Sequence, residues 1–170
     1  SAASDVYKRQ EYVKGKREGY GTYTFPDGEK YEGQWFQDQQ HGKGIYYFMN
    51  NNRYDGMWFQ DYQQGKGTMY YYTGDVYEGD WVNDKREGQG TYTWKNGSKY
   101  EGSWKNDKKD GEGTFVWNDG CKYEGDWKND VRDGKGTFEY ANGDKYVGDW
   151  KDDMQHGKGI YFFHTGDRYE

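Results

Sequence analysis

The side chains with the widest chemical repertoire are few in this 170-residue chain. It contains three histidines, His41, His156 and His164, and a single cysteine, Cys121. A zinc site needs three or four His, Cys or carboxylate ligands at characteristic spacings, and these four residues are scattered along the sequence. We therefore predict no metal site and no cofactor.

Carboxylates are abundant, with 30 Asp and Glu, but their arrangement does not indicate catalysis. The segment 106–112 resembles a calcium loop in outline, yet Lys108 stands where an oxygen ligand belongs. The Gly-Lys-Gly triplets lack the strand–helix context of a phosphate loop. Because the carboxylates recur at fixed intervals, a solvated face is favoured over an acid–base pair. We predict that the chain is not an enzyme.

The element that positions all these residues is a repeat of 23 residues. Tyr recurs at Tyr31, Tyr54, Tyr77, Tyr100, Tyr123, Tyr146 and Tyr169. Each of the first six is followed two positions later by Gly and four positions later by Trp, and a Gly-x-Gly pair and further aromatic residues come next. The predicted organisation is a partial repeat at 11–30, six complete repeats at 31–168, and the start of a truncated repeat at 169–170.

The spacings of two inside the repeat are typical of strands with one buried face. Two strands a repeat are predicted, joined by a six-residue hairpin loop such as 37–42 and, between repeats, by turns built on Asn-Gly or Asp-Gly. Asn51 replaces the turn glycine in one unit, and Asn tolerates the left-handed conformation best after Gly. The resulting register would place Trp35 opposite Gly44, with each indole lying over glycines. We predict an all-β fold, an elongated, curved, single-sheet antiparallel β-meander of 23-residue hairpins.

The composition fits this ring-rich architecture and excludes several partners. The chain has no Leu, only two Ile, and 36 aromatic residues (20 Tyr, 8 Trp and 8 Phe), so its core must be ring against ring and ring against glycine. The net charge of −6 disfavours a nucleic-acid partner. The lone Cys121 fits a reducing compartment, which predicts an intracellular, cytoplasmic protein. No apolar stretch is as long as a transmembrane helix.

The first ten residues stand apart from the repeat. Residues 1–10 resemble a translated transposon-end adapter of the kind used in sequencing libraries, so we predict an artefactual tail.

The unit Tyr-Glu-Gly-x-Trp-Lys-Asn-Asp, clear at residues 100–107, where x is Ser103, and at residues 123–130, where x is Asp126, resembles the MORN repeat over about residues 12–170. One departure is an Asp in all six complete units, at Asp38, Asp61, Asp84, Asp107, Asp130 and Asp153, where the family often has Asn-Gly after the Trp-x step. The resemblance implies an antiparallel β-meander that acts as a scaffold or adaptor, at cytoskeletal or membrane-associated structures. It also leaves open a targeting module of a larger enzyme, of the lipid kinase or methyltransferase type, and a module that tethers anionic lipids such as phosphoinositides.

Three surfaces could bind partners. The ring face is most simply the core, although a ring-lined trough could also take a partner helix or an extended peptide. Its residues are Tyr31, Trp35, Tyr54, Trp58, Tyr77, Trp81, Tyr100, Trp104, Tyr123, Trp127, Tyr146 and Trp150. The opposite face carries an apolar patch in the early repeats, consisting of Phe36, Ile45, Tyr47, Phe59, Tyr70 and Val82. Such a patch predicts contact with a protein partner or with a second copy, unless another segment covers it.

The third surface is a row of lysines in the later repeats. Lys105, Lys128 and Lys151 are spaced 23 residues apart and would line up on one face, with Lys99, Lys122 and Lys145 nearby. Such a row could face anionic membrane lipids, but neighbouring Asp and Glu favour an ordinary solvated face. The predicted function is thus a non-enzymatic scaffold that binds protein partners, including a second copy of itself.

Overall fold

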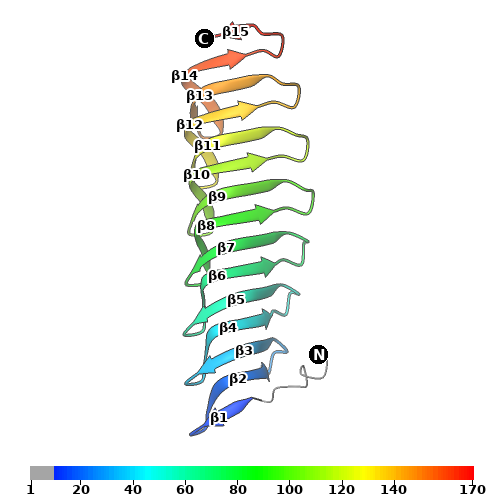
Figure 1. Ribbon diagram of the computed structural model, residues 1–170, viewed down its shortest axis with the longest axis vertical. Helices are drawn as coiled ribbons and strands as arrows, with labels where there is room; N and C mark the ends of the chain where they lie inside the picture. The colour runs from blue at the N-terminus through cyan, green and yellow to red at the C-terminus, as the bar shows by residue number, and fades with distance from the viewer. Residues whose placement is uncertain (1–9) are drawn as a thin grey trace. The chain divides into compact units, whose positions relative to one another are not determined.

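The computed structural model describes residues 10–170, and this part of the chain contains fifteen β-strands and no helix (Figure 1). The strands are β1 (Glu11–Val13), β2 (Lys16–Thr24), β3 (Lys30–Phe36), β4 (Gln39–Tyr47), β5 (Arg53–Phe59), β6 (Tyr62–Tyr70), β7 (Val76–Val82), β8 (Lys85–Thr93), β9 (Lys99–Lys105), β10 (Lys108–Val116), β11 (Lys122–Lys128), β12 (Val131–Glu139), β13 (Lys145–Lys151), β14 (Met154–Phe162) and β15 (Arg168–Tyr169). Their order in the sheet is their order in the sequence. The predicted all-β antiparallel meander is therefore confirmed. Of the predicted tail at residues 1–10, all but Gln10 lies outside the described residues.

The chain divides into two compact units. Unit 1 ends at Lys85 and contains β1–β7, and unit 2 begins at Arg86 and contains nearly all of β8 together with β9–β15. Within each unit, consecutive hairpins follow one another in the sheet (Figure 1). The elongation and curvature of the whole array stay predictions.

The hairpin turn within each repeat contains two residues. The prediction of a six-residue loop is therefore wrong. Only Gln37 and Asp38 connect β3 to β4, and both have positive φ, 47° and 70°. Two consecutive left-handed residues form a turn that matches the twist of the flanking strands, and Gln or Asn followed by Asp adopts it without glycine. The other four residues of the predicted loop, 39–42, form the start of β4. A register shift between β3 and β4 accommodates Gly42 there, at φ 83°.

This turn changes the pairing of the rings. Gly33 lies opposite Gly44, Tyr31 opposite Tyr46, and Trp35 opposite Gln40, so the predicted pairing of Trp35 with Gly44 is wrong. The tyrosine, not the tryptophan, lies over the glycine pair: a Cβ on Gly44 would collide with the Tyr31 phenol ring. The Tyr31 hydroxyl donates to the Gln34 carbonyl at 2.8 Å, at the point where the register shifts. Ring-over-glycine packing thus holds, with a different ring.

The turn between repeats follows the predicted chemistry. Asn51 has φ 69° where Gly97 of a later repeat has φ 92°. The Phe48 and Asn52 backbones close the turn through an N–H···O bond of 2.9 Å. The Asn50 side chain accepts the Asn52 N–H at 3.0 Å, which fixes the turn by a local side-chain bond.

The core is the ring face of the sheet. All twelve tyrosines and tryptophans predicted for this face are buried, and five of the six tyrosines are fully inaccessible to solvent. Adjacent Tyr and Trp rings meet edge to face, as for Tyr100 and Trp104 with centroids 5.2 Å apart. Edge-to-face contacts match the ring quadrupoles, so a leucine-free chain obtains a specific core from them.

Candidate functional site

Neighbouring repeats are joined across the ring face by the tryptophans. The Trp58 Nε1–H donates to the Gly44 carbonyl of the preceding repeat at 3.2 Å, and Trp81, Trp104, Trp127 and Trp150 make the equivalent bond. The Trp35 Nε1 is the exception, since it is buried and has no partner. The five tryptophans that make this bond therefore serve as both core side chains and links between repeats.

A second link comes from the aspartate of the two-residue turn. The Asp107 carboxylate accepts the Arg86 backbone N–H at 2.8 Å, and the Asp107 N–H donates to the Arg86 carbonyl at 3.1 Å. The same carboxylate–N–H pairing recurs for Asp38, Asp61, Asp84, Asp130 and Asp153, always with a residue 21 positions earlier. The recurring Asp that departs from the family pattern is therefore a link between repeats, a role the sequence analysis missed although the residue recurs in every complete unit.

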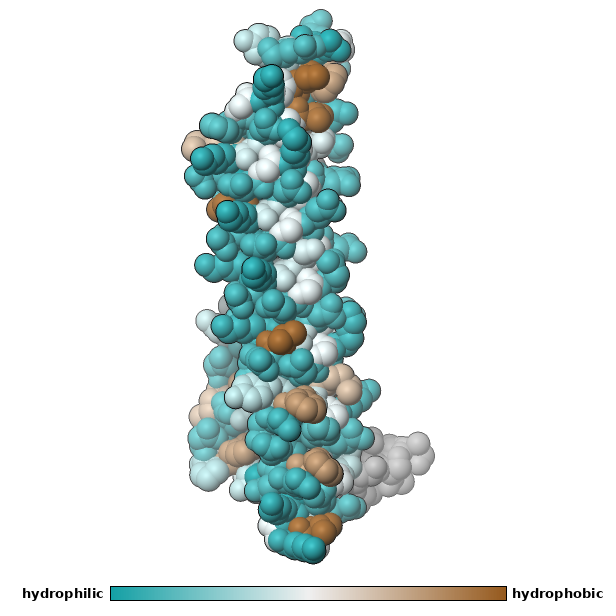
Figure 2. Space-filling model, turned by 90° about the vertical axis from the view of Figure 1, so that its left-hand side faces the viewer, coloured by the Kyte–Doolittle hydropathy of each residue, from teal (hydrophilic) through white to brown (hydrophobic). Residues whose placement is uncertain are grey.

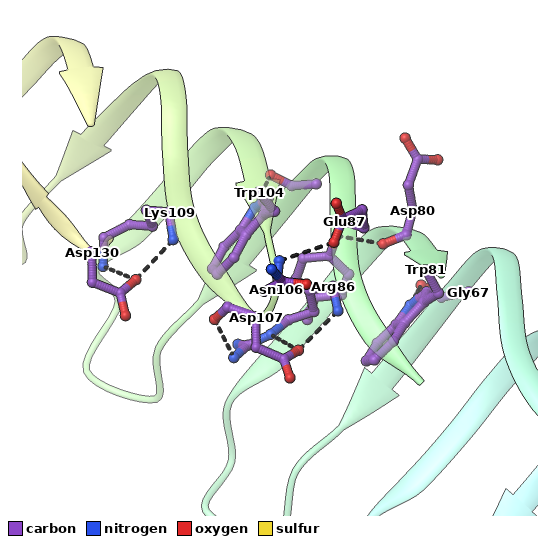
Figure 3. A network of polar contacts seen from close by, with 12 residues as sticks. Gly67, Asp80, Trp81, Arg86, Glu87, Trp104, Asn106, Asp107, Lys109 and Asp130 are labelled. Atoms are coloured by element: carbon purple, nitrogen blue, oxygen red, sulfur yellow. Dashed lines mark hydrogen bonds and ion pairs between the residues drawn. The ribbon is translucent and has the colours of Figure 1, made fainter. Parts of the chain in front are cut away.

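In four repeats this aspartate also holds a cation against the aromatic rings. The Arg86 Nε lies 3.2 Å from the Asp107 carboxylate, its Nη2 donates to the Asp107 carbonyl at 2.9 Å, and its guanidinium lies 4.8 Å from the Trp104 ring centroid (Figure 3). Equivalent groups of cation, tryptophan and aspartate are Arg17–Trp35–Asp38, Lys109–Trp127–Asp130 and Arg132–Trp150–Asp153. We call each of these a cation triad. Hydrogen bonds from Arg17 lower the pKa of Asp38, and burial lowers the pKa of Lys109.

Two repeats, both in unit 1, lack the cation. Gln40 and Gln63 occupy the cation position, next to Trp58 with Asp61 and Trp81 with Asp84. Among the described residues, neither Asp61 nor Asp84 forms an ion pair, and each carboxylate accepts only a backbone N–H. An open groove of about 570 Å³ lies at this place, and we call it the unit 1 groove. Its lining includes Trp35, Trp58, Met69, Gln40, Gln63, Asp61 and Asp84.

The opposite face of unit 1 exposes large side chains near the two-residue turns. Phe36 and Phe59 are about half exposed, and Val82 and Tyr62 lie exposed on the same side. The imidazole of His41 stands between the two phenylalanines, with ring centroids 5.6 Å from Phe36 and 5.1 Å from Phe59. His41 therefore belongs to a strand and to a ring stack, not to a solvated loop as its sequence position suggested. We call Phe36, His41, Phe59, Tyr62 and Val82 the exposed row (Figure 2 shows apolar side chains at this edge of unit 1).

The other members of the predicted apolar patch lie elsewhere on that face. Ile45 is half-buried and pairs with Glu32 on one side and Asp55 on the other. The Lys30 ammonium lies 4.4 Å from the Tyr47 ring centroid, and the Arg53 guanidinium covers Tyr70 at 4.3 Å. The structure thus brings Phe36, Phe59 and Val82 to one end of the strands, while Ile45, Tyr47 and Tyr70 lie among charged side chains.

The lysine row of unit 2, consisting of Lys105, Lys128 and Lys151, is exposed and occupies the strand positions that Phe36, Phe59 and Val82 hold in unit 1. Asp110 and Asp133 line the same surface depression as Lys105 and Lys128. Lys99 and Lys122 pair with Glu101 and Glu124 at 3.6 and 3.5 Å. Carboxylates therefore dilute the positive charge of this face, and lipid binding stays a prediction.

One carboxylate in unit 2 is held ionised by its neighbours. The His164 backbone N–H and the Tyr161 hydroxyl each donate to Asp144 at 2.8 Å, and the His164 Nδ1 lies 2.8 Å from it. These bonds hold the pKa of Asp144 far below its usual range, and the bond to Asp144 raises the pKa of Tyr161 to about 12. The two donated hydrogen bonds and the contact with the His164 ring tie adjacent inter-repeat turns together.

Within residues 10–170, no group of three His, Cys, Asp or Glu side chains is placed to hold a metal ion. In the same residues no helix is long and apolar enough to cross a bilayer.

One solved structure shows a similar fold, and a second matches with a lower score. The TCP domain of SAS-4 from Drosophila melanogaster, solved in complex with a proline-rich motif of Ana2, matches with a TM-score of 0.54 at 17% identity over 96% of this chain and 94% of that one. The G-box domain of the microcephaly protein CPAP matches with a TM-score of 0.38 at 15% identity over 89% of this chain and 97% of that one. No curated protein sequence matches the chain significantly.

The family comparison covers nearly the whole chain. The model of the MORN repeat matches seven times, at residues 11–30, 31–53, 54–76, 77–99, 100–122, 123–145 and 146–168. The predicted resemblance is confirmed, and the chain belongs to the MORN repeat family.

Proposed function

We propose that this chain is a non-enzymatic adaptor that binds protein partners, including a second copy of itself, through the exposed row of unit 1. One observation carries the proposal. Phe36 and Phe59 are 52% and 50% exposed, although they occupy the strand positions that lysines occupy in unit 2. Exposed rings gathered at one place on a surface are typical of protein contacts, because burying them against a partner is favourable.

The fold supports the same proposal. A sheet of two-residue hairpins offers an extended surface in which each repeat places equivalent side chains side by side. The TCP domain of SAS-4, which has this fold, was solved with a bound proline-rich motif. That domain thus provides a precedent for a related sheet acting as a peptide-binding scaffold.

Self-association is the direct test. We expect the average mass of the chain in sedimentation or light-scattering experiments to rise with concentration up to about 100 µM, the range in which weak contacts form. The double variant Phe36→Ser, Phe59→Ser should reduce that rise. The matched control is Lys105→Ser, Lys128→Ser, which changes the equivalent strand positions of unit 2 and should leave it unaltered. An unchanged mass profile in the phenylalanine variant, or a monomer at every concentration, would reject self-association through this row.

The proposal extends to cytoskeletal or membrane-associated structures as the place where the adaptor acts. A tagged chain is expected in the detergent-insoluble cytoskeletal fraction or the membrane fraction of cells. The Phe36→Ser, Phe59→Ser variant should shift toward the freely diffusing fraction. Recovery of the unmodified chain only in that last fraction would contradict this part of the proposal.

A further inference from the structure

We propose that the unit 1 groove binds an extended basic peptide of another protein, whose cationic side chains take the places that arginine and lysine fill in the cation triads. The groove lies on the ring face, whereas the exposed row lies on the opposite face. This inference therefore does not depend on the proposed self-association.

The chain itself shows what the vacant position accepts. In unit 2, Arg132 lies with its Nε 3.1 Å from the Asp153 carboxylate and its guanidinium 4.6 Å from the Trp150 ring centroid. Lys109 makes the same pair of contacts, at 3.6 Å to Asp130 and 5.3 Å to the Trp127 centroid. A tryptophan face beside a carboxylate attracts a cation through both the ring quadrupole and the charge. Both arginine and lysine satisfy the position.

The groove has the features of an incomplete triad. Gln40 and Gln63 are 5% and 4% exposed, and neither side-chain amide makes a hydrogen bond to another described residue. The amide atoms of both residues are not fully buried, and both residues line the groove, so a ligand or water in the groove can reach these amides and pair with them. A peptide backbone entering the groove can supply the donor and acceptor that each amide lacks.

The charge of the groove favours a cationic occupant. Its lining contains three carboxylates, from Asp38, Asp61 and Asp84, and one guanidinium, from Arg17. Arg17 is already paired with Asp38 at 2.5 Å, so two negative charges remain. The field of Asp61 reaches the neighbouring rings, where it contributes with burial to the raised pKa of Tyr46 and Tyr31. Two uncompensated carboxylates beside aromatic walls are complementary to two cations.

The distance between the Asp61 and Asp84 positions indicates which backbone conformation of the peptide fits the groove. Asp61 and Asp84 belong to consecutive repeats, two strands apart, and two strand spacings are about 9.6 Å. A polyproline II helix rises about 9.3 Å in three residues and brings residues i and i+3 to the same side. A β-strand covers a similar distance in three residues, but places i and i+3 on opposite sides. The geometry therefore points to cations at positions i and i+3 of a polyproline II segment.

Peptide binding is measured by fluorescence polarisation on the chain. The probe is a labelled Pro-Arg-Pro-Pro-Arg-Pro peptide, and the comparison peptides replace both arginines by glutamine or place them at adjacent positions. We expect the i, i+3 peptide to bind about tenfold more tightly than either comparison peptide, and to weaken as salt rises from about 50 to 300 mM. Equal binding of the three peptides, no binding of the first, or equally tight binding of arginine amide alone would overturn the proposal.

Three double variants test the site. Gln40→Arg with Gln63→Arg supplies the cations in cis and should abolish peptide binding while keeping the fold, since four repeats already contain the cation. Asp61→Asn with Asp84→Asn removes the charge but keeps an oxygen for the backbone N–H, and it should weaken binding about tenfold. Conversely, Lys109→Gln with Arg132→Gln should create a second peptide site in unit 2. Circular dichroism confirms that each variant is folded, and undiminished peptide binding by the Gln→Arg variant would overturn the proposal.

Discussion

The packing of tyrosine on glycine predicts how a Gly→Ala substitution changes the free energy of unfolding. Strand propensity alone predicts a gain in stability, whereas ring-over-glycine packing predicts a loss. Gly113 faces Gly102 across β10 and β9, and a Cβ on Gly113 would overlap the ring of Tyr100. Tyr100 is fully buried, and its hydroxyl donates to the Ser103 carbonyl at 2.8 Å. The substitution Gly113→Ala therefore introduces a methyl group into space that the ring already fills.

The expected magnitude follows from these contacts. Strand propensity alone predicts that Ala is more stable than Gly by about 0.5–1 kcal/mol. Overpacking costs about 1–3 kcal/mol, and displacing the ring so that its hydrogen bond is lost adds about 1–3 kcal/mol. We expect a net loss of about 1–5 kcal/mol in the free energy of unfolding, opposite in sign to the propensity effect.

Urea unfolding followed by tryptophan fluorescence measures this free energy. The control is Gly97→Asn, at a turn position where Gly97 has φ 92°, a Cβ meets open space, and Asn51 occupies the equivalent site with φ 69°. The control should change stability by less than about 0.5 kcal/mol. In a Tyr100→Ala background, Gly113→Ala should lose most of its cost, because the clashing ring is absent. A stabilising or neutral Gly113→Ala, or an equal cost in both backgrounds, would refute the ring-over-glycine account.

Further outcomes are expected from the other contacts. The pKa of Asp144 is lowered in the folded chain, so its carboxylate stabilises the fold above its unfolded pKa of about 3.9, and this stabilisation is lost as pH falls toward the folded pKa; Asp144→Asn should lower the urea midpoint at pH 7 more than at pH 2. Arg86→Gln should lower the free energy of unfolding in urea by about 1 kcal/mol. Solvent screens the partly exposed ion pair with Asp107, so most of this loss comes from the cation–ring contact with Trp104. Tyr54→Phe should cost about 1–3 kcal/mol by leaving the Met57 carbonyl without its donor at 2.9 Å, whereas an equal cost for the exposed Tyr72→Phe would contradict this reason. In flotation at physiological salt, anionic vesicles should recover little protein, since carboxylates line the lysine row; strong, salt-sensitive flotation lost on neutralising that row would establish lipid binding instead.

The binding surfaces were only partly predictable from the sequence. The contrast between Phe36 and Lys105 at equivalent repeat positions follows from the sequence alone, and it predicted a binding surface in the early repeats. Whether Ile45, Tyr47 and Tyr70 join Phe36 in one patch was not visible, because cross-strand neighbours such as Lys30 and Arg53 reach them only through the pairing register. The absence of the cation at Gln40 and Gln63 could also be recognised only in the structure. Their meaning depends on a tryptophan 18 residues and an aspartate 21 residues further along the chain.

The repeat, its period, the alternation of strand faces and the identity of the core rings were predictable from the sequence alone. These properties are local, since a period of two and a left-handed Asn51 follow from the preferences of single residues and their neighbours. The strand register was not predictable in this way, and it is the register that places Tyr31 rather than Trp35 over glycine. A two-residue turn and a bulge use the same number of residues as a longer loop and no bulge, so spacing alone cannot distinguish them. Only the packing of the Tyr31 ring against Gly33 and Gly44, with its hydroxyl on the freed carbonyl of Gln34, selects one of the two.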